Sequence, residues 1–275
     1  MTKIGFIGTG VMGGALARAV RKKTTGEELL LSNLPASVSE ALAAELECVA
    51  SNNKEVAETC KFIFLAVKPN VIRSVITEIA PVLKQRKDKF IVVSVAAGIT
   101  IETVKQSFGF ELPVIRIMPN TPALCGKGVI LAAFDGVGDY DKTKFFSYLS
   151  DAGLCDDVGE KMIETAGTLT GCGPAFAFVI MQALADGAVA VGVDRAHAVK
   201  YAELTMAGAA ELALTSGKHL EKLKDEVCSP GGSTIEGVYA MEQAAVRAAM
   251  MEAVRASYEK NLELGKNKVL FNKLY

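Results

Sequence analysis

Three glycines near the start of the chain, Gly8, Gly10 and Gly13, have the spacing of a backbone-lined phosphate site. They follow an apolar run at residues 4–7 that predicts a buried strand, and a helical pattern begins at residue 15. In this context the first glycine permits a tight turn, the second lets the backbone approach a pyrophosphate, and the third lets the helix pack closely on the strand. The pattern predicts a dinucleotide site; the alternative is a plain glycine-rich turn between a strand and a helix.

A second glycine-containing stretch, Ser-Pro-Gly-Gly-Ser-Thr at residues 229–234, precedes the last helical segment. Its glycines expose successive N–H groups, the helix dipole favours an anion, and the hydroxyls add donors without a net charge, so the stretch suits a carboxylate. The alternative is an ordinary capping box, because Ser233 and Glu236 are three residues apart. From the spacing alone the two interpretations are equally supported.

A hydroxy-acid dehydrogenase needs a general base, usually Lys or His, and the helical region offers no residue that is expected to fill this role. Residues 162–199 contain no lysine, and His197 and His219 lie in polar stretches where solvated side chains are expected. Hydride removal from an alcohol needs a general base within hydrogen-bond reach, whereas hydride addition to an already protonated imine mainly needs positioning and exclusion of water. The sequence favours imine reduction. The alternatives are another imine or hydroxy-acid reductase, and a non-catalytic dinucleotide-binding sensor, which would not need a second anion site.

The elements that must position these residues differ between the two parts of the chain. Apolar runs at residues 28–33, 61–67, 90–95, 114–118 and 128–134 alternate with helical segments and end in loops of small residues. This alternation is typical of an α/β fold with a Rossmann-type doubly wound sheet, whose ligand lies along the carboxyl edge of the strands. The run at 128–134 is predicted to be the last strand.

Beyond about residue 160 the sequence has only helical periodicity. We therefore predict a dinucleotide-binding Rossmann domain over residues 1–160 and an all-helical domain for substrate binding and dimerisation over residues 161–275. Pro174 suits the first position of a helix. Asp194 is expected to cap a second helix, which ends before Gly217.

Two helical segments carry more apolar surface than their surroundings account for. The stretch 174–193 contains Gln182 and Asp186, which favours a buried helix over a membrane span. The last helix is expected to run unbroken from residue 235 to about residue 264, a length of ~45 Å. Its Ala, Met and Val side chains predict a homo-oligomer built through the helical domain.

The composition excludes several classes of partner and site. The 275 residues include 30 Lys and Arg against 31 Asp and Glu, so neither nucleic acid nor a membrane surface is expected as a partner. No secretory signal is recognised, and the predicted location is cytoplasmic. The scattered cysteines predict free thiols and no metal site; they are Cys48, Cys60, Cys125, Cys155, Cys172 and Cys228.

The end of the second predicted strand bears on the choice of dinucleotide. NAD-selective folds usually place Asp or Glu there, on the ribose 2′-hydroxyl. This chain has Ser32 and Asn33, which are neutral and can donate hydrogen bonds, so NADP(H) is favoured over NAD(H). The stretch has no arginine to hold a 2′-phosphate, which leaves the preference open.

Longer motifs resemble the pyrroline-5-carboxylate reductase family. The segments LTGCGPAFAF (169–178) and DEVCSPGGSTI (225–235) look like the two signatures of that family. Four others are similar to it in the same order: GFIGTGVMGGALA (5–17), FLAVKP (64–69), SVAAGI (94–99) and RIMPNTPA (116–123). The resemblance covers nearly the whole chain.

The resemblance implies an enzyme that reduces 1-pyrroline-5-carboxylate to L-proline, the last step of proline biosynthesis, by hydride transfer from NAD(P)H to the imine carbon. It implies a homodimer through the C-terminal helices, and several members of the family assemble five dimers into a decamer. Thr234 and Glu160 are the implied catalytic positions, Glu160 as an acidic group that favours the protonated imine; a plain helix-start carboxylate is the alternative.

The resemblance also implies the binding residues. The substrate carboxylate would be held by Ser229, Gly231, Gly232, Ser233 and Thr234. The cofactor would lie on Ile7, Gly8, Thr9, Gly10, Val11, Met12, Gly13, Ser32, Asn33, Asn53, Val67, Lys68, Pro69, Ala97, Gly98, Met118, Pro119 and Asn120.

Overall fold

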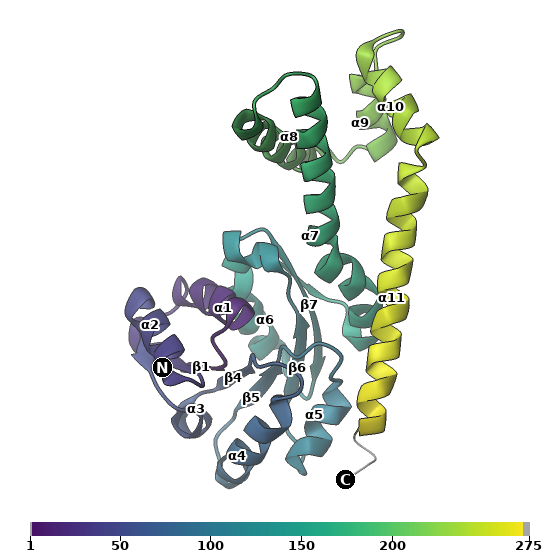
Figure 1. Cartoon of the computed structure of the whole chain (residues 1–275). Coiled ribbons are helices and arrows are strands. Elements are labelled where there is room, and N and C mark those ends of the chain that lie inside the picture. The colour runs from purple at the N-terminus through teal and green to yellow at the C-terminus, as the bar shows by residue number, and fades with distance from the viewer. Residues whose placement is uncertain (1, 272–275) are drawn as a thin grey trace. The chain divides into compact units, whose positions relative to one another are not determined.

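The computed structural model describes residues 2–271, with side chains for residues 2–263. Contacts divide the chain into two compact units (Figure 1). The first contains the residues up to Gly171 and the described residues from Lys260 onward, and the second is Cys172–Glu259. The division into one domain of residues 1–160 and another of residues 161–275 stays a prediction.

The first unit is built on an eight-stranded sheet in the order β3-β2-β1-β4-β5-β6-β7-β8. Neighbouring strands from β3 to β6 are parallel, β7 is antiparallel to β6, and β8 is parallel to β7. This order confirms the predicted doubly wound fold. The strands are β1 (Ile4–Ile7), β2 (Leu29–Ser32), β3 (Val49–Ala50), β4 (Phe62–Leu65), β5 (Ile91–Ser94), β6 (Val114–Met118), β7 (Gly128–Asp135) and β8 (Gly153–Asp157).

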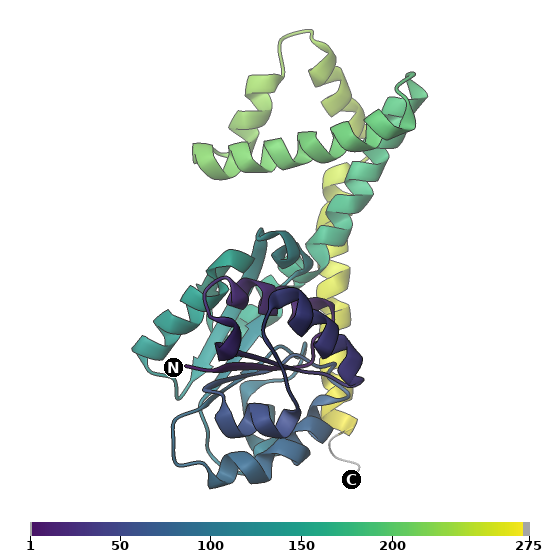
Figure 2. The same cartoon turned by 90° about the vertical axis from the view of Figure 1, so that its left-hand side faces the viewer.

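Helices cover both faces of this sheet, and the two layers can be followed in Figure 2. One face carries α1 (Val11–Arg21), α2 (Ala36–Leu46) and α6 (Asp139–Leu149), and the other carries α3 (Asn53–Thr59), α4 (Ile72–Gln85) and α5 (Ile101–Phe108). Short 3₁₀ helices connect them: η1 (Gly26–Glu28), η2 (Thr121–Cys125) and η3 (Ser150–Ala152).

The alternation of side chains along β4 divides the core between the two faces. Phe62 and Phe64 pack with α1 and α6, whereas Ile63 and Leu65 pack with α3, α4 and α5. All four are essentially inaccessible to solvent. A strand that is apolar on both faces belongs inside a parallel sheet, which is why the continuous apolar run was a reliable signal.

The prediction that the strand at 128–134 is the last one is wrong. Helix α6 and strand β8 follow it, and β8 pairs with β7. The sequence of β8, Gly-Leu-Cys-Asp-Asp, lacks an apolar run because β8 is an edge strand with residues such as Leu154 exposed.

Helix α6 carries a buried carboxylate, Asp141, which forms salt bridges with Lys61 and Lys89. Burial alone would raise the pKa of Asp141, but hydrogen bonds from the two ammonium groups together outweigh burial and hold the pKa below its usual value. The cluster therefore ties α6 to residues near the starts of β4 and β5.

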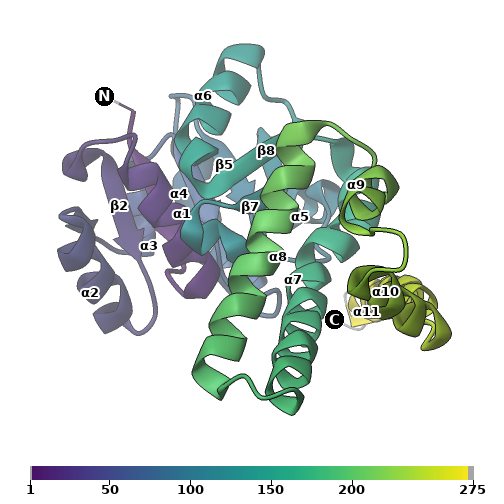
Figure 3. The same cartoon turned by 90° about the horizontal axis from the view of Figure 1, so that it is seen from above.

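The second unit is helical. It contains parts of α7 (Gly159–Ala190) and α11 (Val246–Phe271), together with α8 (Arg195–Ser216), α9 (Leu220–Val227) and α10 (Ser233–Gln243). Helices α7 and α8 lie side by side in Figure 3. The small side chains of Ala185, Ala198 and Ala202 are buried together between them. The predicted caps of α8 are confirmed: Asp194 accepts the His197 N–H, and Gly217 ends the helix in the left-handed region.

Three predictions about these helices need correction. Pro174 lies inside the 32-residue helix α7 rather than at the first position of a helix. The predicted unbroken last helix is interrupted between α10 and α11, where Ala245 has a φ of 55°. The third prediction, that the apolar helix is buried, is also not met: only 6% of the most apolar stretch of α7 is buried within this chain. By length and composition alone, α7 is long and apolar enough to cross a membrane.

Candidate functional site

A cleft of about 360 Å³ lies at the carboxyl edge of the sheet, where β1 ends beside β2 and β4. This is the switch point at which doubly wound sheets bind their ligands. Its lining comes from the ends of β1, β2 and β4, from the start of α3 and from one face of α4: Ile7, Gly8, Gly10, Asn33, Leu34, Asn53, Ala66, Val67, Lys68, Val71, Ser74, Val75 and Glu78.

The three glycines have the distinct geometries that a dinucleotide requires. Gly8 has a φ of 98°, and a Cβ there would lie 2.5 Å from the Ala66 carbonyl oxygen. A Cβ on Gly13 would lie 2.2 Å from the Gly8 carbonyl oxygen, so only glycine allows α1 to start this close to β1. A Cβ on Gly10 would meet nothing within 4 Å and would project into open space at the cleft. The loop therefore fits a pyrophosphate group beside Gly10.

The end of β2 is joined to the glycine loop by Asn33. Its Oδ1 accepts a hydrogen bond from the Thr9 N–H at 2.9 Å, and its Nδ2 donates to the Pro35 carbonyl oxygen at 3.1 Å. The side chain that was predicted to meet the adenosine ribose thus also fixes the loop. Much of its hydrogen-bonding capacity is used within the protein.

The predicted cofactor residues fall into two groups. Ile7, Gly8, Gly10, Asn33, Asn53, Val67 and Lys68 line the cleft. The others lie outside its lining, in or beside the glycine loop or at the ends of β2, β4, β5 and β6: Thr9, Val11, Met12, Gly13, Ser32, Pro69, Ala97, Gly98, Met118, Pro119 and Asn120. Their role in binding stays a prediction.

Sequence reasoning missed the contribution of α4. Val71, Ser74, Val75 and Glu78 all line the cleft, at positions i, i+3, i+4 and i+7. This spacing defines one face of a helix. The signal was available, because a helix starting at Val71 places the polar Ser74 and Glu78 on the same side as two valines.

Glu160, one of the two predicted catalytic residues, is engaged within the first unit. Its Oε1 accepts hydrogen bonds from the Ile101 N–H at 2.7 Å and from Arg116 Nη1 at 2.9 Å. The Arg116 side chain is 97% buried and also pairs with Glu164, one helical turn farther along α7. The cluster joins the start of α5, strand β6 and the first two turns of α7.

Two more residues of β6 and its following loop contact the same helix. The side chain of Met118 lies against Gly167 and Gly171. A Cβ added at either glycine would lie 3.3 Å from the Met118 side chain. Asn120 is buried; its Oδ1 accepts the Val129 N–H, and its Nδ2 donates to the Thr170 carbonyl oxygen at 2.9 Å. Residues 116, 118 and 120 therefore all hold α7.

The bond from Asn120 satisfies a carbonyl that a proline inside α7 leaves without its helical donor. In a regular helix the N–H of residue 174 would donate to the carbonyl of Thr170, but Pro174 has no N–H. The Asn120 amide supplies the missing donor. This pairing was not foreseen from the sequence, which placed Asn120 beside the cofactor only.

The predicted carboxylate-binding stretch lies in the second unit, at the start of α10. Gly232 is the N-cap, and no side chain caps the helix, so the predicted alternative of a Ser233–Glu236 capping box is not formed. Gly231 has a φ of 66°, and the Gly232 N–H donates to the Ser229 carbonyl oxygen at 3.0 Å. A helix start that lacks a side-chain cap offers its first N–H groups to an anion.

The histidines and cysteines lie elsewhere. His197 and His219 are exposed near the starts of α8 and α9, where His197 contacts Asp194 and His219 accepts the Glu221 N–H. The six cysteines are unpaired. Burial raises the pKa of the Cys48, Cys60 and Cys155 thiols to about 11. Over the described residues, no group of three or more His, Cys, Asp or Glu side chains could hold a metal ion.

Two family models match separate parts of the chain. Residues 160–264 match the one described as pyrroline-5-carboxylate reductase dimerisation. Residues 3–98, which include the glycine loop and the end of β5, match the one described as NADP oxidoreductase coenzyme F420-dependent.

Similar proteins match along nearly the whole length. The pyrroline-5-carboxylate reductase of Escherichia coli (strain K12) is 37% identical over 270 residues, which covers 96% of this chain and 99% of that protein. Pyrroline-5-carboxylate reductase 3 of Danio rerio is 38% identical, with 96% and 91% covered. The crystal structure of Plasmodium falciparum pyrroline carboxylate reductase with NADP bound superposes with a TM-score of 0.84 at 30% identity, covering 96% of this chain and 98% of that one. The chain belongs to the pyrroline-5-carboxylate reductase family.

Proposed function

We propose that this protein reduces 1-pyrroline-5-carboxylate to L-proline by transfer of a hydride from NAD(P)H to the imine carbon. The proposal rests on two helix starts whose backbone N–H groups are open to an anion, one in each unit. The first is the glycine loop, with Gly10 open to the cleft, and the second is the start of α10 without a side-chain cap. Membership of the family supports the same reaction.

The first site would hold the dinucleotide along the carboxyl edge of the sheet, on the residues predicted from the sequence and on the face of α4. The dinucleotide supplies the hydride. The second site would hold the substrate carboxylate on the N–H groups at the start of α10 and on the hydroxyls of Ser229, Ser233 and Thr234. Thr234 is the donor proposed to orient the substrate for the reaction.

The chemistry asks little of acid–base side chains. An imine that arrives protonated is electrophilic at carbon, so binding and orientation make the largest contribution. Glu160 is paired with Arg116 and with the Ile101 N–H. We therefore propose that Glu160 acts on the reaction by fixing the start of α7 beside β6, with its negative charge a secondary influence on the iminium ion.

NADP(H) is proposed as the preferred dinucleotide. The end of β2 carries Ser32 and Asn33, and neither repels a 2′-phosphate. The relative from Plasmodium falciparum has NADP bound, which supports the same choice here.

The helical unit is proposed to form a homodimer. Large apolar side chains are exposed on several of its helices, among them Phe178 (63%), Val179 (67%) and Leu204 (60%). A second copy would cover this surface and the apolar length of α7, and the match to a dimerisation family over residues 160–264 supports it. Light scattering would distinguish a dimer from a decamer. The proposed enzyme works in the cytoplasm on a small-molecule substrate, and we propose no nucleic-acid or membrane partner.

The activity is tested by following NADPH oxidation with freshly prepared pyrroline-5-carboxylate. Stoichiometric formation of proline is expected. Turnover with a small hydroxy acid or a different imine instead would replace the proposed substrate. Dinucleotide binding without turnover of any of these compounds would support the sensor alternative.

A matched pair of variants tests the dinucleotide site. Gly10 and Gly138 are both N-caps with extended ψ angles, and an added Cβ meets nothing within 4 Å at either position. A valine therefore weakens the two helix caps similarly, but only Gly10→Val places a side chain at the cleft. At 100 times its Kd a ligand stabilises the folded state by about 2.7 kcal/mol. We expect the NADPH-induced rise in Tm to be lost in Gly10→Val and kept in Gly138→Val.

A further inference from the structure

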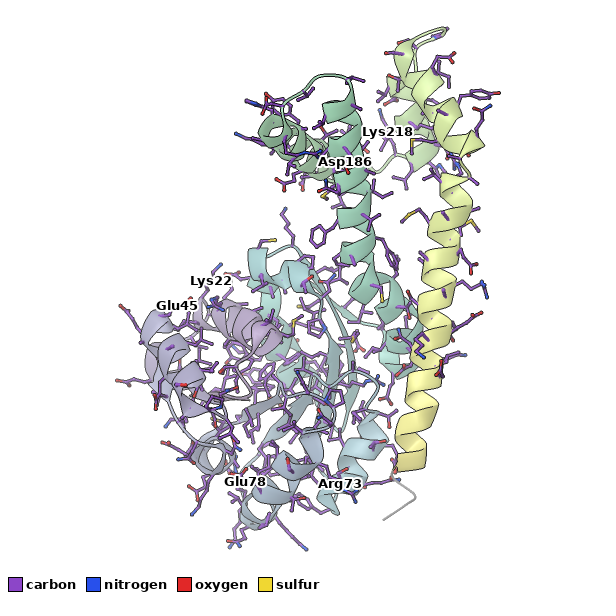
Figure 4. The ribbon with its side chains drawn as sticks, viewed as in Figure 1. Lys22, Glu45, Arg73, Glu78, Asp186 and Lys218 are labelled. Atoms are coloured by element: carbon purple, nitrogen blue, oxygen red, sulfur yellow. The ribbon has the colours of Figure 1, made fainter. Side chains whose placement is uncertain are left out.

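One carboxylate lies on the face of α4 that lines the cleft, and its charge bears on which dinucleotide the cleft prefers. Glu78 is exposed on α4 and is labelled in Figure 4, as is Arg73 of the same helix. The Glu78 Oε2 atom accepts a hydrogen bond from Asn53 Nδ2 at 2.7 Å. Asn53 Oδ1 in turn accepts the Ser32 hydroxyl at 2.7 Å, so the carboxylate is linked through one amide to the end of β2.

The end of β2 is where a dinucleotide fold reads the ribose 2′ position. The sequence has no acidic residue there, but the fold links one from α4 to the end of β2 by two hydrogen bonds through Asn53. Among the residues described as lining the cleft, Lys68 is the one cation, and it follows β4 rather than β2. The linked group Ser32–Asn53–Glu78 thus combines neutral donors with a single negative charge.

A carboxylate near this position distinguishes the two dinucleotides. A ribose 2′-hydroxyl can donate a hydrogen bond to it, whereas a 2′-phosphate, with a charge between −1 and −2 near pH 7, is repelled. The Glu78 carboxylate also accepts a hydrogen bond from one of the two amide hydrogens of Asn53. That hydrogen is then no longer free to bond to a phosphate.

Given the function proposed above, we propose that Glu78 sets the dinucleotide selectivity of this protein, because its carboxylate, held by Asn53, lowers the affinity of the cleft for a ribose 2′-phosphate. NADPH then binds less tightly than Ser32 and Asn33 alone would allow, and the natural preference between NADPH and NADH is small. Glu78 is a specificity residue and takes no part in hydride transfer.

The test measures binding without the imine substrate. Glu78→Gln removes the charge, keeps the shape and leaves an exposed helix surface intact. Glu58→Gln is the control: Glu58 is an exposed carboxylate on α3, paired with Lys54 and outside the lining of the cleft. Calorimetric titrations of both variants and the parent protein use NADPH and NADH. A second pair, 2′,5′-ADP and 5′-AMP, differs only by the 2′-phosphate.

We expect Glu78→Gln to tighten NADPH binding by about tenfold at low salt, which lies between the effects that Coulomb's law gives for unit charges about 4 Å apart in bulk water and near a protein surface. The change should shrink at ~0.5 M salt, because screening weakens it. Affinity for NADH should stay the same or fall, 2′,5′-ADP should follow NADPH, and 5′-AMP should follow NADH.

Each outcome has one meaning. If both dinucleotides bind and Glu78→Gln leaves the ratio of their Kd values unchanged, the selectivity proposal is wrong and the proposed function stands. If Glu58→Gln shifts the ratio as much as Glu78→Gln does, net charge rather than this position is responsible, and the proposal is also overturned. If neither dinucleotide binds the parent protein, the proposed function fails together with it.

Discussion

The contact between Asn120 and α7 leads to a prediction that can be tested by a double-mutant cycle. The Thr170 carbonyl accepts the Asn120 amide because Pro174 cannot supply an N–H. In the variant Pro174→Ala, the N–H of residue 174 can donate to this carbonyl as in a regular helix. The Asn120 amide should then be partly redundant.

The magnitude follows from the bonds that each change removes. Asn120→Ala deletes the donor to the Thr170 carbonyl and the acceptor of the Val129 N–H. Leaving a buried polar group unsatisfied costs about 1–3 kcal/mol. Pro174→Ala offsets the first loss but not the second. We therefore expect Asn120→Ala to cost about 2–6 kcal/mol in the parent protein, and about 1–3 kcal/mol less in the Pro174→Ala background.

The assay is urea unfolding at one fixed protein concentration, since an oligomer makes apparent stability concentration-dependent. Pro81 provides the control, because it also lies inside a helix, α4, and Asn120 makes no hydrogen bond there. Asn120→Ala combined with Pro81→Ala should be additive within about 0.5 kcal/mol. Additivity in the Pro174 cycle as well would refute the idea that the amide replaces the missing N–H.

Three other changes have defined expectations. Asp141→Asn should lower the free energy of unfolding by about 3 kcal/mol at neutral pH, because two lysines lose a buried partner. Since the folded pKa of Asp141 lies below its usual value of 3.8, the stabilisation is complete above that pH and is lost as the pH falls below it, so urea titrations of the parent and the variant should converge in acid. Thr234→Ala should raise the KM for the imine about tenfold or more, from a loss of ~1.5–3 kcal/mol, without changing the Kd of NADPH measured by calorimetry; an equal loss of NADPH binding would remove Thr234 from the substrate site. Burial raises the pKa of Cys60 to about 11, so mass spectrometry after iodoacetamide treatment should find the exposed Cys125 labelled well before it.

The sequence predicted strands, turns and helix caps correctly where the residue pattern depends on the element itself. The apolar run of β4 predicts a strand buried on both faces, and the glycine loop predicts its own turn. The caps of α8 at Asp194 and Gly217 follow from local backbone requirements. None of these depends on which element lies opposite.

The failures concern features that depend on a distant partner. The edge strand β8 has no apolar run, and its pairing with β7 is visible only in the fold. The sequence predicts a helix start at Pro174, whereas Pro174 lies inside α7. The donor that replaces its missing N–H comes from Asn120, which is distant in the sequence. Glu78 lies far from β2 in the sequence, and Asn53 connects the two through hydrogen bonds.

The hydrogen bonds near the carboxyl edge of the sheet also restrict the chemistry that the first unit can perform. Asn33 is bonded to Thr9 and Pro35, Asn120 to Val129 and Thr170, and Glu160 to Arg116 and Ile101. The amides of Asn33 and Asn120 are not general acids or bases, and the Glu160 carboxylate, held by Arg116 and the Ile101 N–H, is poorly placed to exchange a proton with a substrate. A reaction that delivers a hydride to an iminium carbon needs the geometry and not the proton transfer. The same bonds that make these residues structural therefore favour imine reduction over alcohol oxidation.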